Sequence, residues 1–458
     1  MSFFAVLGAI VTILAAGFGA LQLVLPSRVR TGFASACALS WLFGTCIVSA
    51  LIWVVGFVAR GAIVPTIVAL ICVALPLVVC RIKGPPSFWW PDWRRLRAID
   101  VVLASILAAQ VVIIFYLSCV HTLGGDGILN WEIKARYAYE NAGVLPATYL
   151  QDSGRAFSHP EYPLAIPYTE LWLYFWLGDS NQFWAKTIFP LFYLAGVILL
   201  SSIIAQLTGK TWTGLVGSIL LFFIPQVSVG GGSVIVGYAD FPLSVFYLAT
   251  IGYLIRACRP DVDGSFPVYG VCLAFLPWVK REGIVLWVFA ALCGALVIVL
   301  RKKSPKNLLA LLPGLSVIAG WKLYLLRMHA VSSFDFSPLS LSTLQCSIHR
   351  LGSILSELGS ELAATDKWSF LWALAVIAAA FFLRRYRDIR ASVVLAAVIG
   401  PICVYGLSYT FSAWPNYIAH LQLSISRLLM HVTPLVVLLI VAALPPNSAQ
   451  VSEALSAD

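Results

Sequence analysis

The chain has 458 residues, of which 60% are hydrophobic and only 11% are Asp, Glu, Lys or Arg. A soluble globular domain is about half apolar and carries roughly twice this density of charge, so the composition excludes one and indicates a polytopic membrane protein. The formal net charge of +10 would suit a nucleic-acid partner, but the basic residues lie mainly in alternate connections between apolar runs, which gives the charge another explanation.

Apolar runs long enough to cross a hydrocarbon core of ~30 Å recur along the chain and predict an all-α protein with about thirteen transmembrane helices. The predicted spans cover residues 3–25, 32–58, 62–80, 99–120, 183–206, 212–229, 239–257, 266–279, 284–300, 308–326, 368–383, 391–410 and 428–445. The first run has no basic n-region and is longer than the apolar part of a signal peptide, so we expect a span there.

The basic residues predict the topology. More than half of the 30 Lys and Arg lie in alternate connections, and by the positive-inside rule those connections face the cytoplasm. The N-terminus is then outside, the tail at 446–458 is cytoplasmic, and most of the 20 acidic residues lie on the outer side. The net charge is therefore a topology signal, and no nucleic-acid partner is expected.

Three leading helices (1–80) are expected to precede a basic cytoplasmic linker (81–98) and a membrane core (99–445). The linker combines helix-breaking prolines, tryptophans suited to a membrane interface and a cluster of basic residues. The ten cysteines are scattered, with no CxxC pair and no Cys/His spacing typical of zinc sites, so neither disulfides nor structural zinc is expected.

Two long outer loops are predicted. The first, 121–181, contains an apolar segment at 162–178 that we expect to be a helix at the outer surface, because a crossing there would invert every later basic loop. The second, 328–367, carries apolar residues at helical spacing, with Glu357 and Glu361 off the stripe. The apolar stripe consists of Leu341, Leu344, Ile348, Leu351, Leu355, Leu358 and Leu362. Such a helix either lies in the membrane interface as the floor of an outer cavity or packs on the protein itself.

Charged residues are costly near membrane spans, at about 2.5–3.5 kcal/mol each at the bilayer centre, so those that occur need a cavity or a partner. Asp126 lies in "GGDG", where glycines let the backbone approach a ligand, and it is either a carboxylate general base or a solvated loop residue. Lys134 follows in "NWEIKAR" and is either a phosphate-binding cation or an interface cation with its head in water.

Two further segments combine acids with rigid or flexible backbone. His159 and Glu161 in "SHPEYPL" precede prolines and could bind a metal or substrate hydroxyls, or form an ordinary polar loop. Asp240 in "GGGSVIVGYADFPL" follows a glycine run at the outer start of a span. A helix cap explains the aspartate but leaves the glycines unexplained.

The last two features are cationic. Lys280 and Glu282 flank Arg281 at the tip of a short predicted hairpin, where charges near the membrane either pair with one another or bind a phosphate. Arg427 lies at the outer start of the last span, between His420 and His431. Because all these features belong to one membrane face, we expect them to form one outer pocket.

The order and spacing of "NWEIKAR", "SHPEYPL", "YADFPL", "KREG" and "SRLLMH" resemble the bacterial GT-C glycosyltransferases over roughly residues 99–435. These are integral membrane enzymes akin to protein O-mannosyltransferases and the lipid A aminoarabinose transferase. The resemblance implies a GT-C-like fold in the inner (plasma) membrane and an inverting transfer, on the periplasmic face, of a sugar from a polyprenyl-phosphate donor to a lipid, glycan or protein acceptor. It also implies catalytic roles for Asp126, as the base, and for Asp240, which would orient the acceptor or sugar or complete a weak metal site. Phosphate binding would fall to Lys280, Arg427 and Lys134.

Two departures from the family pattern affect this reading. A single aspartate stands in "GGDG" where some relatives have two neighbouring acids, which leaves a divalent metal undecided. The segment "SIS" precedes Arg427 where an acidic partner is expected. The alternatives are a transporter or flippase of lipid-linked saccharides, which should have charges near the bilayer midplane, and another lipid-using enzyme such as an O-antigen ligase or polymerase.

Overall fold

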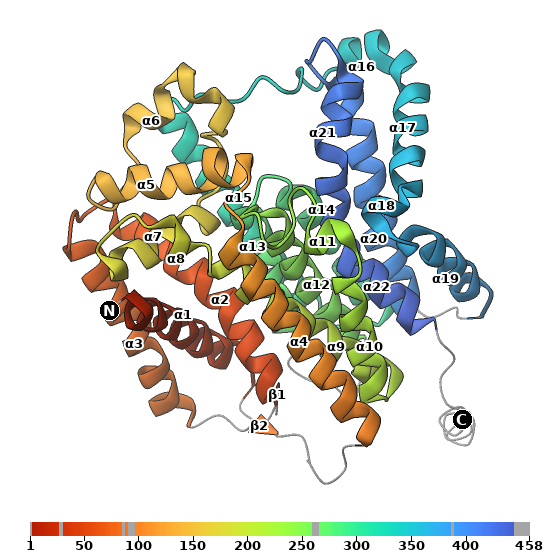
Figure 1. The fold of residues 1–458 in the computed structure, drawn as a ribbon, viewed down its shortest axis with the longest axis horizontal. Helices are drawn as coiled ribbons and strands as arrows, with labels where there is room; N and C mark the ends of the chain where they lie inside the picture. The colour runs from red at the N-terminus through yellow and green to blue at the C-terminus, as the bar shows by residue number, and fades with distance from the viewer. Residues whose placement is uncertain are drawn as a thin grey trace.

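The described residues, 2–26, 31–84, 88–89, 97–258, 265–385 and 389–443 of a computed structural model, form an almost entirely helical protein (Figure 1). Extended pairing among them is limited to β1 (Thr31–Gly32) beside β2 (Phe88–Trp89) and one bridge between Phe336 and Ser412. The all-α prediction is confirmed. Most of the predicted basic linker 81–98 and the whole tail 446–458 lie outside the described residues.

Four long helices open the chain: α1 (Ser2–Val24), α2 (Phe33–Val55), α3 (Ile63–Lys83) and α4 (Ala98–Val120). Helices α1 and α2 cross closely because glycines lie at their contact. A Cβ atom on Gly17 would lie 1.8 Å from the Ser40 carbonyl oxygen, and one on Gly44 would lie 1.9 Å from that of Ile13. Such small-residue contacts are typical of membrane helix pairs. Helix α2 also packs on later helices, so the leading helices join the core.

The first long loop forms several short helices. They are a π-helix at Gly127–Glu132 (η2), α5 (Ile133–Glu140), α6 (Ala147–Gln151), a 3-10 helix at Ser153–Ser158 (η3) and α7 (Ala165–Leu177). Helix α7 is the helix predicted within 162–178. At 13 residues it is too short to span a bilayer, and it is buried against α1, α2 and α5.

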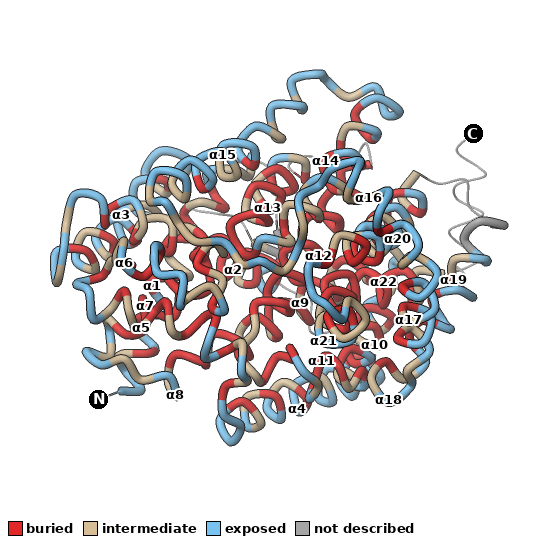
Figure 2. The backbone as a smooth tube through the Cα atoms, turned by 90° about the horizontal axis from the view of Figure 1, so that it is seen from above, coloured by how far each residue is buried: buried red, intermediate tan, exposed pale blue. Residues whose placement is uncertain are grey.

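The centre of the protein is α12 (Asp240–Ala257), whose residues 240–255 are all buried. It is preceded by α8 (Gln182–Ala185), α9 (Ile188–Thr208), α10 (Thr211–Phe222) and α11 (Pro225–Ser228). Helix α12 packs against α9 and α13 (Ser265–Val279), and Figure 2 shows the buried residues concentrated along these helices. Asp240, at the first position of α12, is therefore placed inside the protein.

The C-terminal half continues with helices on both sides of α12. In order they are α14 (Gly283–Leu300), a 3-10 helix at Pro305–Leu311 (η4), α15 (Leu312–Arg327), α16 (Leu341–Ser347), a 3-10 turn at Ile348–Arg350 (η5), α17 (Leu351–Ala363), α18 (Thr365–Trp368), α19 (Leu371–Arg385), α20 (Ile389–Ser408), a 3-10 turn at Tyr409–Phe411 (η6), α21 (Tyr417–Met430) and α22 (Thr433–Ala442).

The prediction of one amphipathic helix with all seven apolar residues on one face is wrong. The 3-10 turn at Ile348–Arg350 separates α16 from α17, so the seven residues do not belong to one continuous α-helix. Leu358 is buried where α17 meets α20 and α21, whereas Leu341 and Leu355 are exposed. Glu361, predicted off the stripe, is buried and accepts hydrogen bonds from Lys367 and Trp368. Packing on the protein, the second alternative, is what α17 does.

Eight of the described helices are long and apolar enough to cross a membrane, or nine if α21 and α22, bent by 50° at their junction, count as one span. They support a polytopic membrane protein. Helices also form at the other predicted spans, but α10 and α13 have only 12 and 15 residues, fewer than the ~20 that a crossing requires. The total of about thirteen spans therefore stays a prediction.

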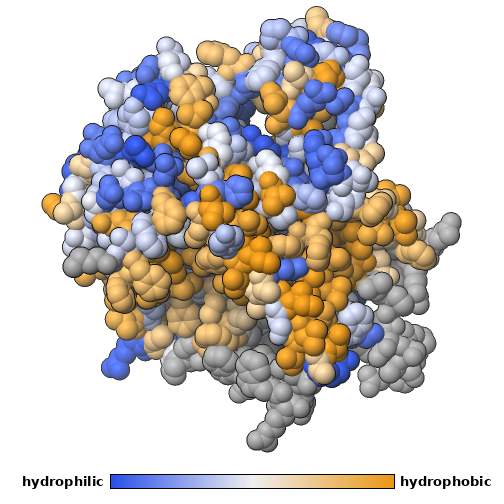
Figure 3. Space-filling model, viewed as in Figure 1, coloured by the Kyte–Doolittle hydropathy of each residue, from blue (hydrophilic) through white to orange (hydrophobic). Residues whose placement is uncertain are grey.

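The two long loops gather at one end of the molecule. Helices α5, α6 and α16 lie at this end, and β1 and β2 lie at the opposite end (Figure 1). Figure 3 shows hydrophilic residues over α5 and α6 and hydrophobic residues over α4 and α19. We call the end with α5, α6 and α16 the polar end. A hollow with hydrophilic walls opens there between α6 and α21 (Figure 3).

Candidate functional site

A cavity of about 550 Å³ lies at the polar end, a size typical of ligand sites. It is built by the two long loops, the hairpin between α13 and α14, the loop before α12, and α21. The polar residues in its wall that bear on chemistry include Asp126, Asn130, His159, Tyr162, Tyr238, Lys280, Glu282, Asp335, His420 and Arg427. Segments far apart in the sequence thus meet around one space.

Asp240 lies behind the cavity wall at the centre of an ion-pair network. Its side chain has 0% exposure, and its Oδ1 atom lies 2.7 Å from Lys280 Nζ and 3.0 Å from His431 Nε2. Its Oδ2 atom lies 3.3 Å from Arg427 Nε. A charge removed from water requires such partners, because the desolvation cost is otherwise several kcal/mol. Asp240 is therefore placed to hold these three cationic or imidazole side chains from inside the protein.

Arg427 connects this buried network to the cavity. Its Nη1 atom lies 2.5 Å from Asp126 Oδ2, and its guanidinium group lies 4.8 Å from the centre of the Tyr238 ring. The planar, forked guanidinium can bind two carboxylates at once. The acidic partner missing from the sequence next to Arg427 is thus supplied by Asp126 and Asp240.

Asp126 is the accessible carboxylate of the pair, with 32% of its side chain exposed. Its backbone N–H donates to the Tyr238 hydroxyl over 3.2 Å. The neighbouring glycines allow this contact, since a Cβ on Gly127 would lie 2.5 Å from the Val236 carbonyl oxygen. The Gly124 N–H donates to the same oxygen over 2.8 Å. The glycines were predicted to let the backbone approach a ligand. In the structure they let the Asp126 turn pack closely against the loop before α12.

Lys134, expected either to bind phosphate or to keep its head in water, lies outside the cavity wall with 0% exposure. Its ammonium group donates to the backbone oxygens of Asn130 and Ser158 over 2.7 and 2.8 Å. Burial lowers the pKa of Lys134 to about 7, against the opposite effect of Glu161 and Asp126. Lys134 thus ties the π-helix to the turn that carries His159.

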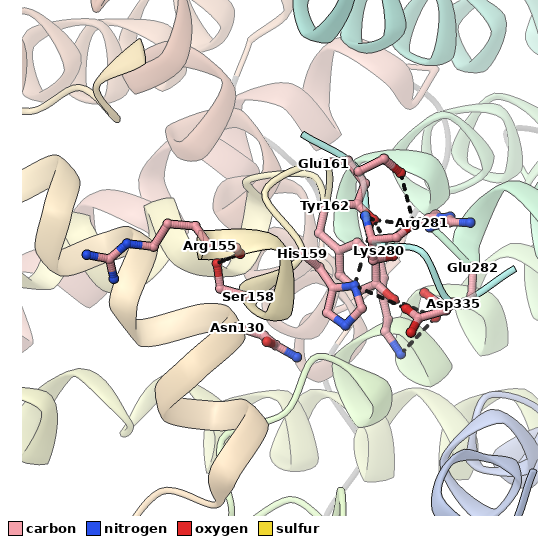
Figure 4. Close-up of polar contacts among 12 residues, drawn as sticks. Asn130, Arg155, Ser158, His159, Glu161, Tyr162, Lys280, Arg281, Glu282 and Asp335 are labelled. Carbon is pink, nitrogen blue, oxygen red and sulfur yellow. Dashed lines mark hydrogen bonds and ion pairs between the residues drawn. The ribbon is translucent and has the colours of Figure 1, made fainter. Parts of the chain in front are cut away.

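Glu161 anchors the "SHPEYPL" corner to later parts of the chain (Figure 4). Its carboxylate accepts from Ser333 Oγ over 2.9 Å and from Arg281 Nη1 over 3.2 Å. Burial raises the pKa of Glu161, but the nearby His159 and the hydrogen bond from Ser333 outweigh this and lower it to about 2. His159, with a φ of 48°, lies 3.7 Å from both Glu161 Oε1 and Asp335 Oδ2. His159 lines the cavity, whereas Glu161 lies behind it.

The predicted hairpin forms between α13 and α14, with Lys280, Arg281 and Glu282 at its tip. Lys280 has 2% side-chain exposure and lies 3.5 Å from Glu282 as well as beside Asp240. Burial raises the pKa of Glu282, but the interactions with Lys280 and His431 outweigh this and lower it. The Tyr162 hydroxyl donates to Glu282 Oε1 over 3.2 Å. The pairing alternative is thus present in the structure, and both residues still line the cavity.

Asp126, Lys280, Glu282 and Arg427 come together as predicted, with His159 in the same wall. Sequence reasoning missed Tyr238, Asp335, Tyr409 and Trp414, which also line the cavity. Asp335 could have been noticed, because it is a lone acid in the apolar stretch "FDFSPL" of the second loop. The aromatic residues could not, since the chain has 16 Trp and 17 Tyr.

Among the described residues, no group of three or more His, Cys, Asp or Glu side chains could hold a metal ion. Comparison of the chain with known protein families, with curated proteins and with solved structures gives no match.

Proposed function

We propose that the protein is a membrane glycosyltransferase that moves a sugar from a polyprenyl-phosphate donor to an acceptor hydroxyl or amine. The observation that supports this most is the position of Asp126, an accessible carboxylate beside a guanidinium at the edge of a polar cavity in an apolar protein. A donor with a prenyl tail must be met where membrane and water meet. A polar cavity at the end of a set of apolar helices suits that requirement.

In the proposed reaction, the acceptor X–H attacks the anomeric carbon while the bond from this carbon to the phosphate oxygen breaks. The acceptor proton passes to Asp126, and the electron pair of the broken bond leaves on the prenyl phosphate. Attack opposite the leaving group inverts the anomeric carbon. No redox partner is needed, because the products are the glycosylated acceptor and the prenyl phosphate.

The cations are suited to the leaving group. Arg427 and Lys280 line the cavity, and both are held by Asp240 from behind. A fixed cation stabilises charge that develops on the departing phosphate without having to reorganise. The donor phosphate also competes with Asp126 for the guanidinium of Arg427. Donor binding would therefore release Asp126 to act as the base.

The orientation is part of the proposal. The basic connections predict that the polar end faces the periplasm or the cell exterior, with the protein in the inner (plasma) membrane. The opposite end carries β1, which follows the basic residues Arg28 and Arg30, and β2, which lies within the basic linker 81–98; both connections are predicted to be cytoplasmic (Figure 1). The resemblance to GT-C enzymes favours the same arrangement.

Mass spectrometry of lipid-linked sugars and surface glycans, with and without the protein in the organism that encodes it, tests this function. Loss of the protein should remove one sugar from a surface lipid, glycan or protein and should increase the polyprenyl-phosphate sugar. Unchanged glycans would contradict the proposal. Movement of lipid-linked sugar across vesicles by the purified protein, without transfer, would favour the flippase alternative.

A further inference from the structure

The second long loop and the segment after α20 build an aromatic surface in the cavity that the proposed chemistry does not use. The Trp414 ring is stacked on His420, with centroids 4.7 Å apart and planes at 14°. The His420 ring is fixed by a hydrogen bond of 2.8 Å to Ser412 Oγ. Trp414 is 37% exposed, and among the described residues no ring is stacked on its other face. One face of Trp414 is thus supported and the other is available to a ligand.

The backbone holds this surface in place. The Ser337 N–H donates to the Phe411 oxygen over 2.7 Å, and the Ala413 N–H donates to the Asp335 oxygen over 2.9 Å. The Trp414 indole N–H then donates to Asp335 Oδ1 over 3.0 Å. A carboxylate is therefore fixed at the edge of the exposed ring. Its other oxygen, Oδ2, lies 3.7 Å from His159 Nδ1 and can accept a hydrogen bond from a ligand.

A second carboxylate in the wall is also incompletely bonded. Glu282 Oε1 accepts from the Tyr162 hydroxyl over 3.2 Å. Its Oε2 atom is buried and has no hydrogen-bond partner among the described residues. A buried carboxylate oxygen without a donor is costly, by about 1–3 kcal/mol or more, so a ligand hydroxyl that reaches it is favoured.

From these features we infer that Trp414, Asp335 and Glu282 form a subsite for a pyranose ring. A pyranose has an apolar C–H face, which suits the free face of Trp414, and hydroxyls at its edge, which suit carboxylate acceptors. His420 and Arg427 are seven residues apart in α21, about 10 Å along the helix axis and on the same side. A sugar joined to a phosphate at Arg427 can reach this distance. The inference deepens the proposed function and rests on it.

The test measures ligand binding to the full chain in a sugar-free zwitterionic detergent by saturation-transfer NMR. The probes are farnesyl phosphate, farnesyl phosphate carrying a hexose, and a methyl hexopyranoside added together with farnesyl phosphate. The variants are Trp414→Ala, Trp414→Phe and Asp335→Asn. Trp176→Ala is the matched control, because Trp176 on α7 is 38% exposed and outside the cavity wall.

Trp414→Ala should weaken binding of a sugar-bearing probe about tenfold. Binding of farnesyl phosphate without a sugar should not change. Trp414→Phe should restore part of the loss, because it keeps an apolar ring. If Trp414→Ala weakens binding of the farnesyl-linked hexose only, the subsite holds the donor sugar. If it weakens binding of the methyl hexopyranoside only, the subsite holds a sugar of the acceptor. Equal effects on all three probes, or none, would overturn the subsite. Failure of farnesyl phosphate to bind in an Arg427-dependent way would instead overturn the proposed function.

Discussion

Arg427 and Asp126 form an ion pair of 2.5 Å at the cavity edge, although one lies near the last span and the other in the first long loop. The same arginine contacts the fully buried Asp240 with its Nε atom. A change that moves the Asp126 turn should therefore affect catalysis and the buried network together.

Gly127→Ala should displace this turn, because the added Cβ would lie 2.5 Å from the Val236 carbonyl oxygen, a backbone atom that cannot move aside easily. We expect a loss of about 1–3 kcal/mol in the free energy of unfolding, as for other overpacked sites, and at least a tenfold loss of sugar transfer. Gly125→Ala is the matched control, since no atom lies within 4 Å of a Cβ there. Equal behaviour of the two variants, in unfolding and transfer assays, would show that the turn is not tightly packed.

Lys280→Met should destabilise the protein by about 3–5 kcal/mol, because it removes a partner from a buried carboxylate. The double variant Asp240→Asn, Lys280→Met should be more stable than this single variant, since the charge that needs the lysine is gone. Lys367→Met is the comparison: Lys367 also lies 2.7 Å from a carboxylate, that of Glu361, but it is 38% exposed and should contribute under about 1 kcal/mol. Denaturant unfolding in detergent measures all three. Equal losses in the two lysine variants would contradict the burial argument.

Lys134 should make stability depend on pH. Burial lowers its pKa to about 7 from the ordinary value of 10.5, so between these values the unfolded chain binds more protons than the folded chain. The free energy of unfolding should then rise as pH increases from about 7 to about 10.5, by at most about 1.4 kcal/mol per pH unit. Lys134→Met should reduce this rise, whereas substitution of the exposed Lys322 by Met should not. Parallel curves for wild type and Lys134→Met would contradict the burial effect.

The sequence predicted those features of the fold and the site that follow from a single strong physical requirement. Hydrophobic length predicted the helices, and the cost of charge near a membrane singled out Asp126, Lys280 and Arg427, which do lie together. The requirement is that charges be paired or solvated, and it does not specify which partner each takes. Asp240 illustrates this limit, because its three partners are Arg427 in α21, His431 just after α21, and Lys280 in the hairpin between α13 and α14.

The remaining features depend on tertiary packing. The sequence around Lys134 does not tell whether its ammonium group is in water or bound to backbone oxygens. Only the fold of the 121–181 loop buries the group against the oxygens of Asn130 and Ser158. The stripe from Leu341 to Leu362 matches a helical period, yet a 3-10 turn at Ile348–Arg350 breaks it. Trp414 belongs to the cavity because a bridge between Phe336 and Ser412 joins two distant segments, and no local pattern predicts that pairing.

In the proposed reaction, Asp126 removes a proton from the acceptor as the sugar is transferred. The most direct measurement is the rate at which prenyl phosphate is released from a radiolabelled polyprenyl-phosphate hexose, with membrane extract as the source of acceptor. Wild type is compared with Asp126→Asn and with the control Asp179→Asn, which changes an exposed aspartate of the same loop. We expect Asp126→Asn to lower the rate by about 10²–10⁴ while donor binding and expression stay nearly intact, and Asp179→Asn to transfer at the wild-type rate. Transfer by Asp126→Asn at the wild-type rate would contradict this role of Asp126.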